Sequence, residues 1–216
     1  MCRIAIHTGC TIDIYPLDER ESGTNCDNQN FSFCYNSIIQ EEYCEKTLEE
    51  LHILIEKGDV VTVTELGERY YSGIGVEENI DVAIVYFTRA ADAGYPVAEF
   101  ILGIFYDKGQ HISHNVTRAL EYYWKSANGG YPEAEYKLGE MYYLGQGCEK
   151  NDSKALYWIL KTVEELEDPD IYIAPAIIYK DSEDESVRDE KRAFECVNKA
   201  VEFGEEDSYN LLGTFY

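Results

Sequence analysis

The residues of this chain whose types and spacing could do chemistry are one carboxylate and two histidines. Asp107, His111 and His114 fall close together in what we expect to be a single loop. A carboxylate oxygen and two imidazole nitrogens are ligands that Zn²⁺ accepts. The same spacing is common in ordinary exposed loops, and a plain loop is the preferred interpretation. We therefore expect no metal site and no cofactor.

Acid–base catalysis would need a defined pair of carboxylates, and this chain has too many to single one pair out. It contains 42 Asp and Glu residues against 18 Lys and Arg residues. They occur in runs such as EELEDPD and SEDESVRDE, which are typical of solvated charged surfaces. We predict no catalytic residue among them, and we expect the chain not to be an enzyme.

The net charge of −24 limits the partners that the chain can bind. The phosphates of DNA, RNA and anionic membranes would be repelled, so we expect no direct contact with any of them. The charge favours a basic protein partner and fast, salt-sensitive association. The alternative is that the charge serves solubility alone. From Ile159 onward the chain has 16 acidic and 6 basic residues, so this part is expected to form a negative patch of its own.

The N-terminus and the cysteines bear on the compartment. The segment MCRIAIHTGCTIDIYPLDE lacks a basic region followed by a sustained apolar stretch, so we expect no secretory signal. The seven cysteines are most simply interpreted as reduced thiols, and we expect a cytoplasmic protein. Asn30, Asn115 and Asn151 each begin an Asn-x-Ser/Thr triplet. Such triplets matter only in a secretory route.

A sequence block that recurs every 36 residues determines the secondary-structure elements that position these residues. Leu-Gly pairs begin at Leu66, Leu102 and Leu138, and a tyrosine follows each of these leucines four residues later. A fixed period of this size indicates an array of stacked supersecondary units. Such arrays present extended surfaces, so the period favours a binding protein.

Each block is expected to form two helices, which we call helix A and helix B. Helix A carries the Leu-Gly pair and ends at a glycine-bearing turn, since glycine permits positive φ just past a helix end. The turns are Gly73-Ile74-Gly75, Lys108-Gly109 and Gly145-Gln146-Gly147. Helix B follows, for example over residues 119–128, and Tyr-Pro then starts the next helix A, because proline is tolerated in a first helical turn.

The register extends beyond the three clear copies. A fourth copy begins near Asp170 and is longer by two residues, which fall in the acidic segment KDSEDESVRDE, an expected surface loop. Residues 30–59 are predicted to be a degenerate first repeat with a weak helix A at 31–39, and residues 60–216 form the main array. Residues 1–29 lie outside the pattern. Their alternation around Thr8-Gly9 suggests a β-hairpin, with a disordered leader as the alternative.

These blocks resemble the Sel-one-like repeat family, a relative of the tetratricopeptide repeats. The resemblance covers about residues 46–216, and the motif residues of its best copy are Leu66, Gly67, Tyr70, Gly73, Gly75, Val76, Asp81, Ala83, Tyr86, Phe87, Ala90, Ala91 and Gly94. Two later copies depart from the pattern: His111 stands in place of a turn glycine, and Leu166 replaces a closing glycine.

The resemblance implies an all-α, right-handed superhelical solenoid that serves as an adaptor for protein complexes, here with a short N-terminal β-hairpin or irregular segment. Some cysteine-rich relatives have been linked to penicillin binding, which would use a serine with a lysine three residues later. No such Ser-x-x-Lys occurs in this chain. An acylating enzyme is therefore not expected.

One side of helix A carries no core positions and is expected to be exposed. At about 100° per residue, the side opposite Leu66 and its equivalents recurs in each copy. The residues expected there are Tyr71, Phe100, Ile101, Ile104, Tyr136 and Tyr143, rimmed by Glu68 and Glu140. In family members helix A lines the concave face, and exposed aromatic residues are common interface anchors. The alternative is that tight superhelical packing buries these side chains.

The leading hypothesis is a non-enzymatic interaction module that binds a protein, or an extended segment of one, along this face. The partner is expected to be basic, and the chain is expected to be a monomer or to self-associate weakly. The alternative is an acidic inhibitor, of phage or pathogen type, that occupies the basic nucleic-acid groove of an enzyme with its carboxylates in place of phosphates.

Overall fold

The computed structural model describes residues 2–7, 11–16, 46–109, 111–166, 169–202, 209 and 212–213. For residues 2–7, 11–16, 169 and 170 only the backbone is described. The chain divides into two units, Met1–Tyr86 and Phe87–Tyr216. The expected helix A at 31–39 lies outside the described residues, as do most of the residues after Glu202.

The first unit begins with two strands, β1 (Cys2–His7) and β2 (Thr11–Pro16), which pair antiparallel in the backbone. This antiparallel pairing agrees with the expected β-hairpin rather than with a disordered leader. Helix α2 (Leu48–Glu56) is the helix expected in the degenerate first repeat, and its N-terminus is closed by a capping box between Thr47 and Glu50. It packs against α3 (Val60–Ser72), and the first turns of α4 (Ile80–Asp92) complete the unit.

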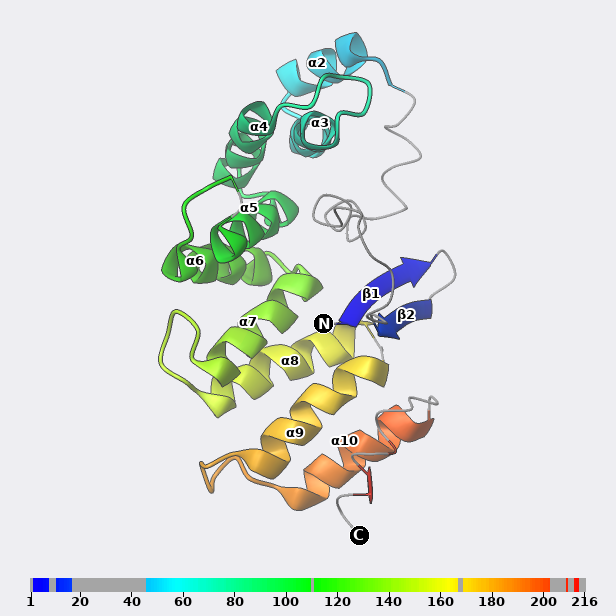
Figure 1. The fold of residues 1–216 in the computed structure, drawn as a ribbon, viewed down its shortest axis with the longest axis vertical. Coiled ribbons are helices and arrows are strands. Elements are labelled where there is room, and N and C mark those ends of the chain that lie inside the picture. Colours follow the sequence, from blue (N-terminus) through cyan, green and yellow to red (C-terminus); the bar gives the residue numbers. More distant parts are fainter. Residues whose placement is uncertain are drawn as a thin grey trace, which may run out of the picture. The chain divides into compact units, whose positions relative to one another are not determined.

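The second unit holds the end of α4 and three further helix pairs, drawn from green to orange in Figure 1. They are α5 (Pro96–Lys108) with α6 (Val116–Asn128), α7 (Pro132–Leu144) with α8 (Asp152–Leu166), and α9 (Ile173–Asp181) with α10 (Glu190–Glu202). A 3₁₀ turn, η1 (Pro169–Tyr172), precedes α9. The all-α repeat solenoid is confirmed, including the proline starts of α5 and α7.

One backbone connection closes every helix pair in the same way. The tyrosine near the end of helix A accepts a hydrogen bond at its carbonyl from the residue that begins helix B. The bonds join Tyr70 to Asn79 (2.7 Å), Tyr106 to Asn115 (2.9 Å), Tyr142 to Asn151 (2.8 Å) and Tyr179 to Asp189 (2.9 Å). The tyrosine that recurs in the sequence thus marks the point where each helix pair is tied together.

The residue that donates this bond also caps helix B with its side chain. The Oδ1 atoms of Asn79, Asn115, Asn151 and Asp189 accept from the backbone N–H three residues later, at 2.8–3.1 Å. Asparagine and aspartate are favoured at this position because the first N–H groups of a helix have no partner within it. Two of the three Asn-x-Ser/Thr triplets, at Asn115 and Asn151, are therefore helix caps.

The turn between the helices requires a left-handed backbone at two places. Gly73, Gly109 and Gly145 end their helices with φ between 67° and 69°, as expected. The second place is filled by Gly75 and Gly147 in two copies, and by His111 with φ 62° in the third. A side chain in this region is strained, so the sequence departure noted at His111 has a cost in backbone energy.

Close approach of the two helices depends on a glycine in two of the pairs, α5 with α6 and α7 with α8. A Cβ added at Gly103 would lie 2.6 Å from Cε1 of Tyr123, and one added at Gly139 would lie 2.5 Å from Cγ1 of Ile159. Real Cβ atoms do not make contacts this short, because packed interiors have no spare volume. Gly103 and Gly139 are therefore packing residues at the points where the two helices meet.

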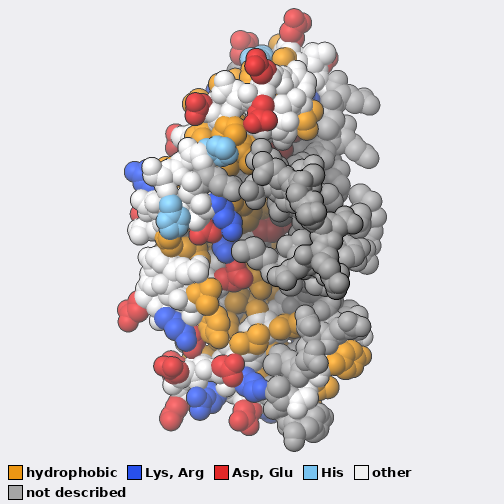
Figure 2. Space-filling view, viewed as in Figure 1, with side chains coloured by type: hydrophobic (Ala, Val, Ile, Leu, Met, Phe, Trp, Pro, Cys, Tyr) orange, Lys and Arg blue, Asp and Glu red, His pale blue; other side chains and the backbone are white. Residues whose placement is uncertain are grey.

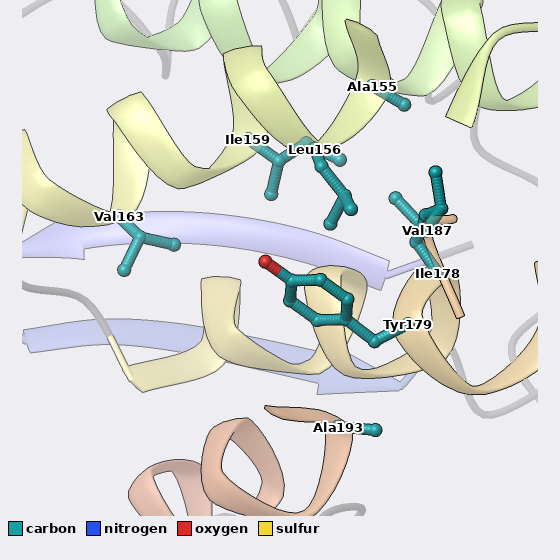
Figure 3. Packing of buried hydrophobic residues seen from close by; sticks show 8 residues of the cluster. All are labelled: Ala155, Leu156, Ile159, Val163, Ile178, Tyr179, Val187 and Ala193. Atoms are coloured by element: carbon teal, nitrogen blue, oxygen red, sulfur yellow. The ribbon is translucent and has the colours of Figure 1, made fainter. Parts of the chain in front are cut away.

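The last helix pair is joined to the preceding one by a hydrophobic cluster, drawn in Figure 3. The cluster brings together side chains of α8, α9, α10 and the loop before α10, namely Ala155, Leu156, Ile159, Val163, Ile178, Tyr179, Val187 and Ala193. The acidic segment before α10 was expected to be a surface loop, but two of its residues are buried. Ser182 donates to Oδ2 of Asp152 at 2.6 Å, and Val187 enters the cluster.

Replacing Asn115 by alanine should remove the cap of α6 and lower the free energy of unfolding by about 1 kcal/mol. Asn115→Asp keeps an acceptor at the same place and should stay close to the parent chain. Urea denaturation followed by circular dichroism measures both. Equal stability of the alanine variant and the parent would show that the cap does not contribute.

Gly139→Leu should force the α7–α8 contact apart and cost about 1–3 kcal/mol of unfolding free energy. Gly213→Leu is a suitable control, because a Cβ there meets no atom of the described residues within 4 Å. Differential scanning calorimetry compares the two variants. A Gly139→Leu variant that melted with the parent would contradict the close approach of the helices.

Candidate functional site

The helix-A surface of the second unit is formed by residues of α5 and α7. On α5, the ring of Phe100 lies 5.5 Å from the ring of Tyr123 and 5.1 Å from that of Tyr131, measured between centroids. Ile104 packs beside Phe100 against the cluster that contains Tyr123. Both side chains are half-buried, so each belongs to the core along one edge and meets solvent along the other.

On α7, Tyr136 and Tyr143 pack against the cluster shared by α8, α9 and α10. Both rings are half-buried, and Nζ of Lys150 lies 5.2 Å from the ring centroid of Tyr143. Glu140 lies between the two tyrosines in the sequence, is partly exposed and forms an ion pair with Lys137 at 3.2 Å. In Figure 2, hydrophobic side chains gather over the part of the chain formed by α7, α8 and α9.

Two residues that we expected on this surface are packing residues instead. Ile101 is 4% exposed and Tyr71 is 8% exposed, so neither offers a side chain to a partner. Superhelical packing buries them, as the alternative interpretation held. Of the expected apolar positions, Phe100, Ile104, Tyr136 and Tyr143 keep an accessible edge. We define these four residues and Glu140 as the helix-A strip.

Glu68 lies on α3 in the first unit and is half-buried. Burial, reinforced by the neighbouring carboxylate of Glu65, raises the pKa of Glu68 to about 9. Glu65 itself is buried and paired with Arg69 at 3.1 Å. Glu68 therefore carries a proton at neutral pH and does not supply the negative charge that the sequence suggested for it.

Buried carboxylates are a feature that the sequence did not indicate. Glu99 and Glu135 occupy equivalent positions of α5 and α7, and burial raises the pKa of each. Each faces a lysine of the following helix B: Lys125 interacts with Glu99, and Lys161 donates to Oε1 of Glu135. Oε2 of Glu135 has no hydrogen-bond partner among the described residues. These carboxylate–lysine pairs link helix A to helix B. The two glutamates, and likewise the two lysines, are 36 residues apart in the sequence.

Two strongly exposed aromatic side chains of the second unit lie on helix B, a surface that the sequence did not single out. Tyr157 of α8 is 62% exposed and Trp124 of α6 is 51% exposed. Basic residues lie near them at equivalent positions, Lys125 on α6 and Lys161 on α8. The sequence indicates these positions by a basic residue that recurs at the repeat spacing in helix B.

Metal chemistry finds no support in the described part of the chain. No group of three or more His, Cys, Asp or Glu side chains there is arranged to hold a metal ion. His111 and His114 are both exposed, and the His111 ring lies edge-on to Phe105 with centroids 6.5 Å apart. None of the described helices is long and apolar enough to cross a membrane.

Glu68→Gln should raise stability at pH 8 and flatten its dependence on pH. The folded-state pKa lies above the ordinary value of about 4.3, so the folded chain holds a proton that the unfolded chain releases. Stability should therefore fall as the pH rises from about 4 to about 9 in the parent chain. Urea titrations at several pH values measure this, with the exposed Glu77→Gln as control. Parallel profiles for the parent and Glu68→Gln would contradict the assignment.

Comparison with known proteins identifies the repeats. Residues 64–95, 96–131 and 132–164 each match the model of the Sel1 repeat. None of the curated proteins compared with the chain matches it.

Two solved structures are similar over most of the chain. A Sel1 repeat protein from Oxalobacter formigenes is 27% identical with a TM-score of 0.69, over 81% of this chain and 72% of that one. A protective antigen present in uropathogenic Escherichia coli strains, which displays an SLR fold, is 31% identical with a TM-score of 0.69. That match covers 79% of this chain and 36% of the antigen, so this chain spans about a third of the antigen's length. The matched repeats and the helix pairs that they form make this chain a Sel1-like repeat protein.

Proposed function

We propose that the chain is a non-enzymatic adaptor that binds a protein partner along the helix-A strip of its second unit. Sel1 repeat proteins generally mediate protein–protein interactions, and the family is generally a non-enzymatic scaffold. That general role supports the class of function. The choice of surface rests on the side chains themselves.

The observation that carries the proposal is the half-burial of the aromatic rings. Tyr136 and Tyr143 pack with one edge on the cluster of α8, α9 and α10. A ring fixed in this way loses little conformational freedom when a partner covers its other edge. Tyrosine is among the residues that contribute most to binding energy at protein interfaces. Phe100 and Ile104 extend the same kind of surface along α5.

The charge of the chain supports a basic partner. Glu140 is the carboxylate of the strip, and its ion pair with Lys137 is partly exposed to solvent. Exposed pairs of this kind are weak, so a lysine or arginine of a partner can compete for the carboxylate. The net charge of −24 would speed the encounter with such a partner at low salt.

The alternative function, an acidic inhibitor that imitates a nucleic acid, rests on the same net charge. The basic side chains of helix B weigh against it. Arg118, Lys154 and Arg192 are exposed at equivalent positions of α6, α8 and α10. A phosphate-like surface would be uniformly negative, whereas these cations interrupt the acidic surface of the second unit.

We also propose that the protein works in the cytoplasm. Cys148 and Cys196 are free cysteines, and burial raises the pKa of both thiols. A raised pKa keeps a thiol protonated and unreactive at neutral pH, which suits cysteines with a packing role in a reducing compartment.

The double variant Glu140→Ala and Tyr143→Ala should reduce partner capture at least about tenfold, because it removes one anchor ring and the carboxylate beside it. The measurement uses the immobilised chain in extract of its host, with captured proteins quantified by mass spectrometry. Tyr209→Ala, at an exposed tyrosine outside the strip, is the matched control and should capture normally.

Salt distinguishes the two candidate functions in the same experiment. Capture through buried apolar rings should persist as salt rises, and nucleic acid should not displace the partner. Steep loss of the partner with salt, together with displacement by nucleic acid, would instead favour the inhibitor. Equal capture by the double variant and the parent, with both folded by circular dichroism, would overturn the proposed strip.

A further inference from the structure

We infer that the helix-A strip includes a site for one arginine side chain of the partner, formed by the carboxylates of Asp107 and Glu140 and the hydroxyl of Tyr123. These residues lie on α5, α7 and α6, so three helices of the second unit contribute one group each. The inference rests on the proposed function, because it specifies what a partner of the strip must carry.

The first step is the position of the Tyr123 ring. The residue is 1% exposed and packs from α6 against α5 at Gly103. A Cβ added at Gly103 would lie 3.2 Å from Cζ of Tyr123, the ring carbon that bears the hydroxyl. The missing side chain at Gly103 thus brings the hydroxyl end of the ring against helix A. The hydroxyl makes no hydrogen bond with the described residues.

Two carboxylates lie near this hydroxyl. Burial raises the pKa of Tyr123, and the charges of Asp107 and Glu140 raise it further. A carboxylate has this effect only where it lies close to the hydroxyl and water screens the charge poorly. Asp107 and Glu140 therefore approach one buried hydroxyl from two neighbouring helices A. A neutral hydroxyl keeps two acceptor lone pairs, so it too can receive a donor.

The charges around the hydroxyl do not balance. Asp107 is half-buried and forms no hydrogen bond or ion pair with its side chain in the described part of the chain. Oε2 of Glu140 pairs with Nζ of Lys137 at 3.2 Å. Two carboxylates and one lysine leave one uncompensated negative charge. A single cation from a partner would neutralise it.

The other lysines nearby do not supply this cation. Lys108 follows Asp107 in the sequence and is exposed, and adjacent residues of a helix do not face each other. Lys150 is paired with Asp152 at 3.7 Å. The charge of Asp107 is therefore left for a partner to neutralise.

The repeat itself does not require a carboxylate at this position. Tyr71 and Tyr143 stand where Asp107 stands, one repeat earlier and one repeat later. A half-buried carboxylate without a cation destabilises the folded chain. Departures from packing rules of this kind are expected at functional sites.

The surroundings favour arginine among the basic side chains. Ile104 lies one helical turn before Asp107, and Tyr136 lies one turn before Glu140, so each carboxylate has an accessible apolar neighbour on its own helix. The guanidinium group is planar, is weakly hydrated and has five N–H donors, which suits several acceptors beside apolar surface. It also stacks favourably on aromatic rings. The expected ligand is an arginine flanked by apolar residues.

The test is a two-dimensional NMR titration of the full chain, labelled with ¹⁵N, with the tripeptide acetyl-Leu-Arg-Leu-amide as the probe. Backbone amide signals of α5 and α7 around Asp107 and Glu140 should shift saturably. The same tripeptide with citrulline, which has the shape of arginine without its charge, should bind at least about tenfold more weakly. Lysine in place of arginine should weaken binding at least about threefold.

Variants of the chain test each group of the site. Asp107→Asn should weaken binding of the arginine tripeptide at least about fivefold and leave binding of the citrulline tripeptide within about twofold. Tyr123→Phe keeps the packed ring and should weaken the arginine tripeptide about twofold or more. The matched control is Asp181→Asn, which removes the same charge from an exposed aspartate at the end of α9 and should bind within about twofold of the parent. Circular dichroism should show every variant folded.

Three results would overturn the inference: no saturable shift with the arginine tripeptide, equal binding of arginine and citrulline, or equal weakening by Asp107→Asn and Asp181→Asn. None of these would touch the proposed function as long as Glu140→Ala with Tyr143→Ala still loses the partner from host extract. Tripeptide binding as expected, together with normal capture by that double variant, would overturn the proposed function and leave the arginine site standing.

Discussion

The close contact between helix A and helix B at Gly103 and at Gly139 is the constraint on which the rest of the structure depends. Gly103 faces the ring of Tyr123 and Gly139 faces Ile159, with no room for a Cβ. This contact sets the spacing of α5 with α6 and of α7 with α8. The bond from the cap residue to the tyrosine carbonyl sets the register of all four described pairs. The glycines and tyrosines that define the repeat therefore make contacts within it. A partner can bind only the sides of the helices that these contacts leave exposed.

Two such sides carry accessible aromatic side chains, and they differ in chemistry. The helix-A strip offers half-buried rings with one carboxylate, Glu140. Helix B offers exposed Trp124 and Tyr157 among cations that are stacked on rings.

The sequence predicted the fold well because its signals were local and repeated. The 36-residue period, the turn glycines and the Tyr-Pro starts each have a direct structural cause within one repeat. The candidate site was harder to predict. A helical wheel places Ile101 and Tyr71 outside the core of their own helix, but burial depends on neighbours that the wheel does not contain. The buried Ser182–Asp152 bond joins a loop to a helix 30 residues away, and the protonation of Glu68 at neutral pH depends on its surroundings in three dimensions.

Site-specific photo-crosslinking tests the central claim, that helix A presents the surface for the protein partner, most directly. A photoreactive phenylalanine analogue replaces Tyr143 on α7 or, as a comparison, the exposed Leu144 beside it, which is not part of the strip. After irradiation in host extract, the account predicts one discrete protein adduct from position 143 and much less of it from position 144. Adducts of equal yield and identity from both positions, or none from position 143, would contradict the account.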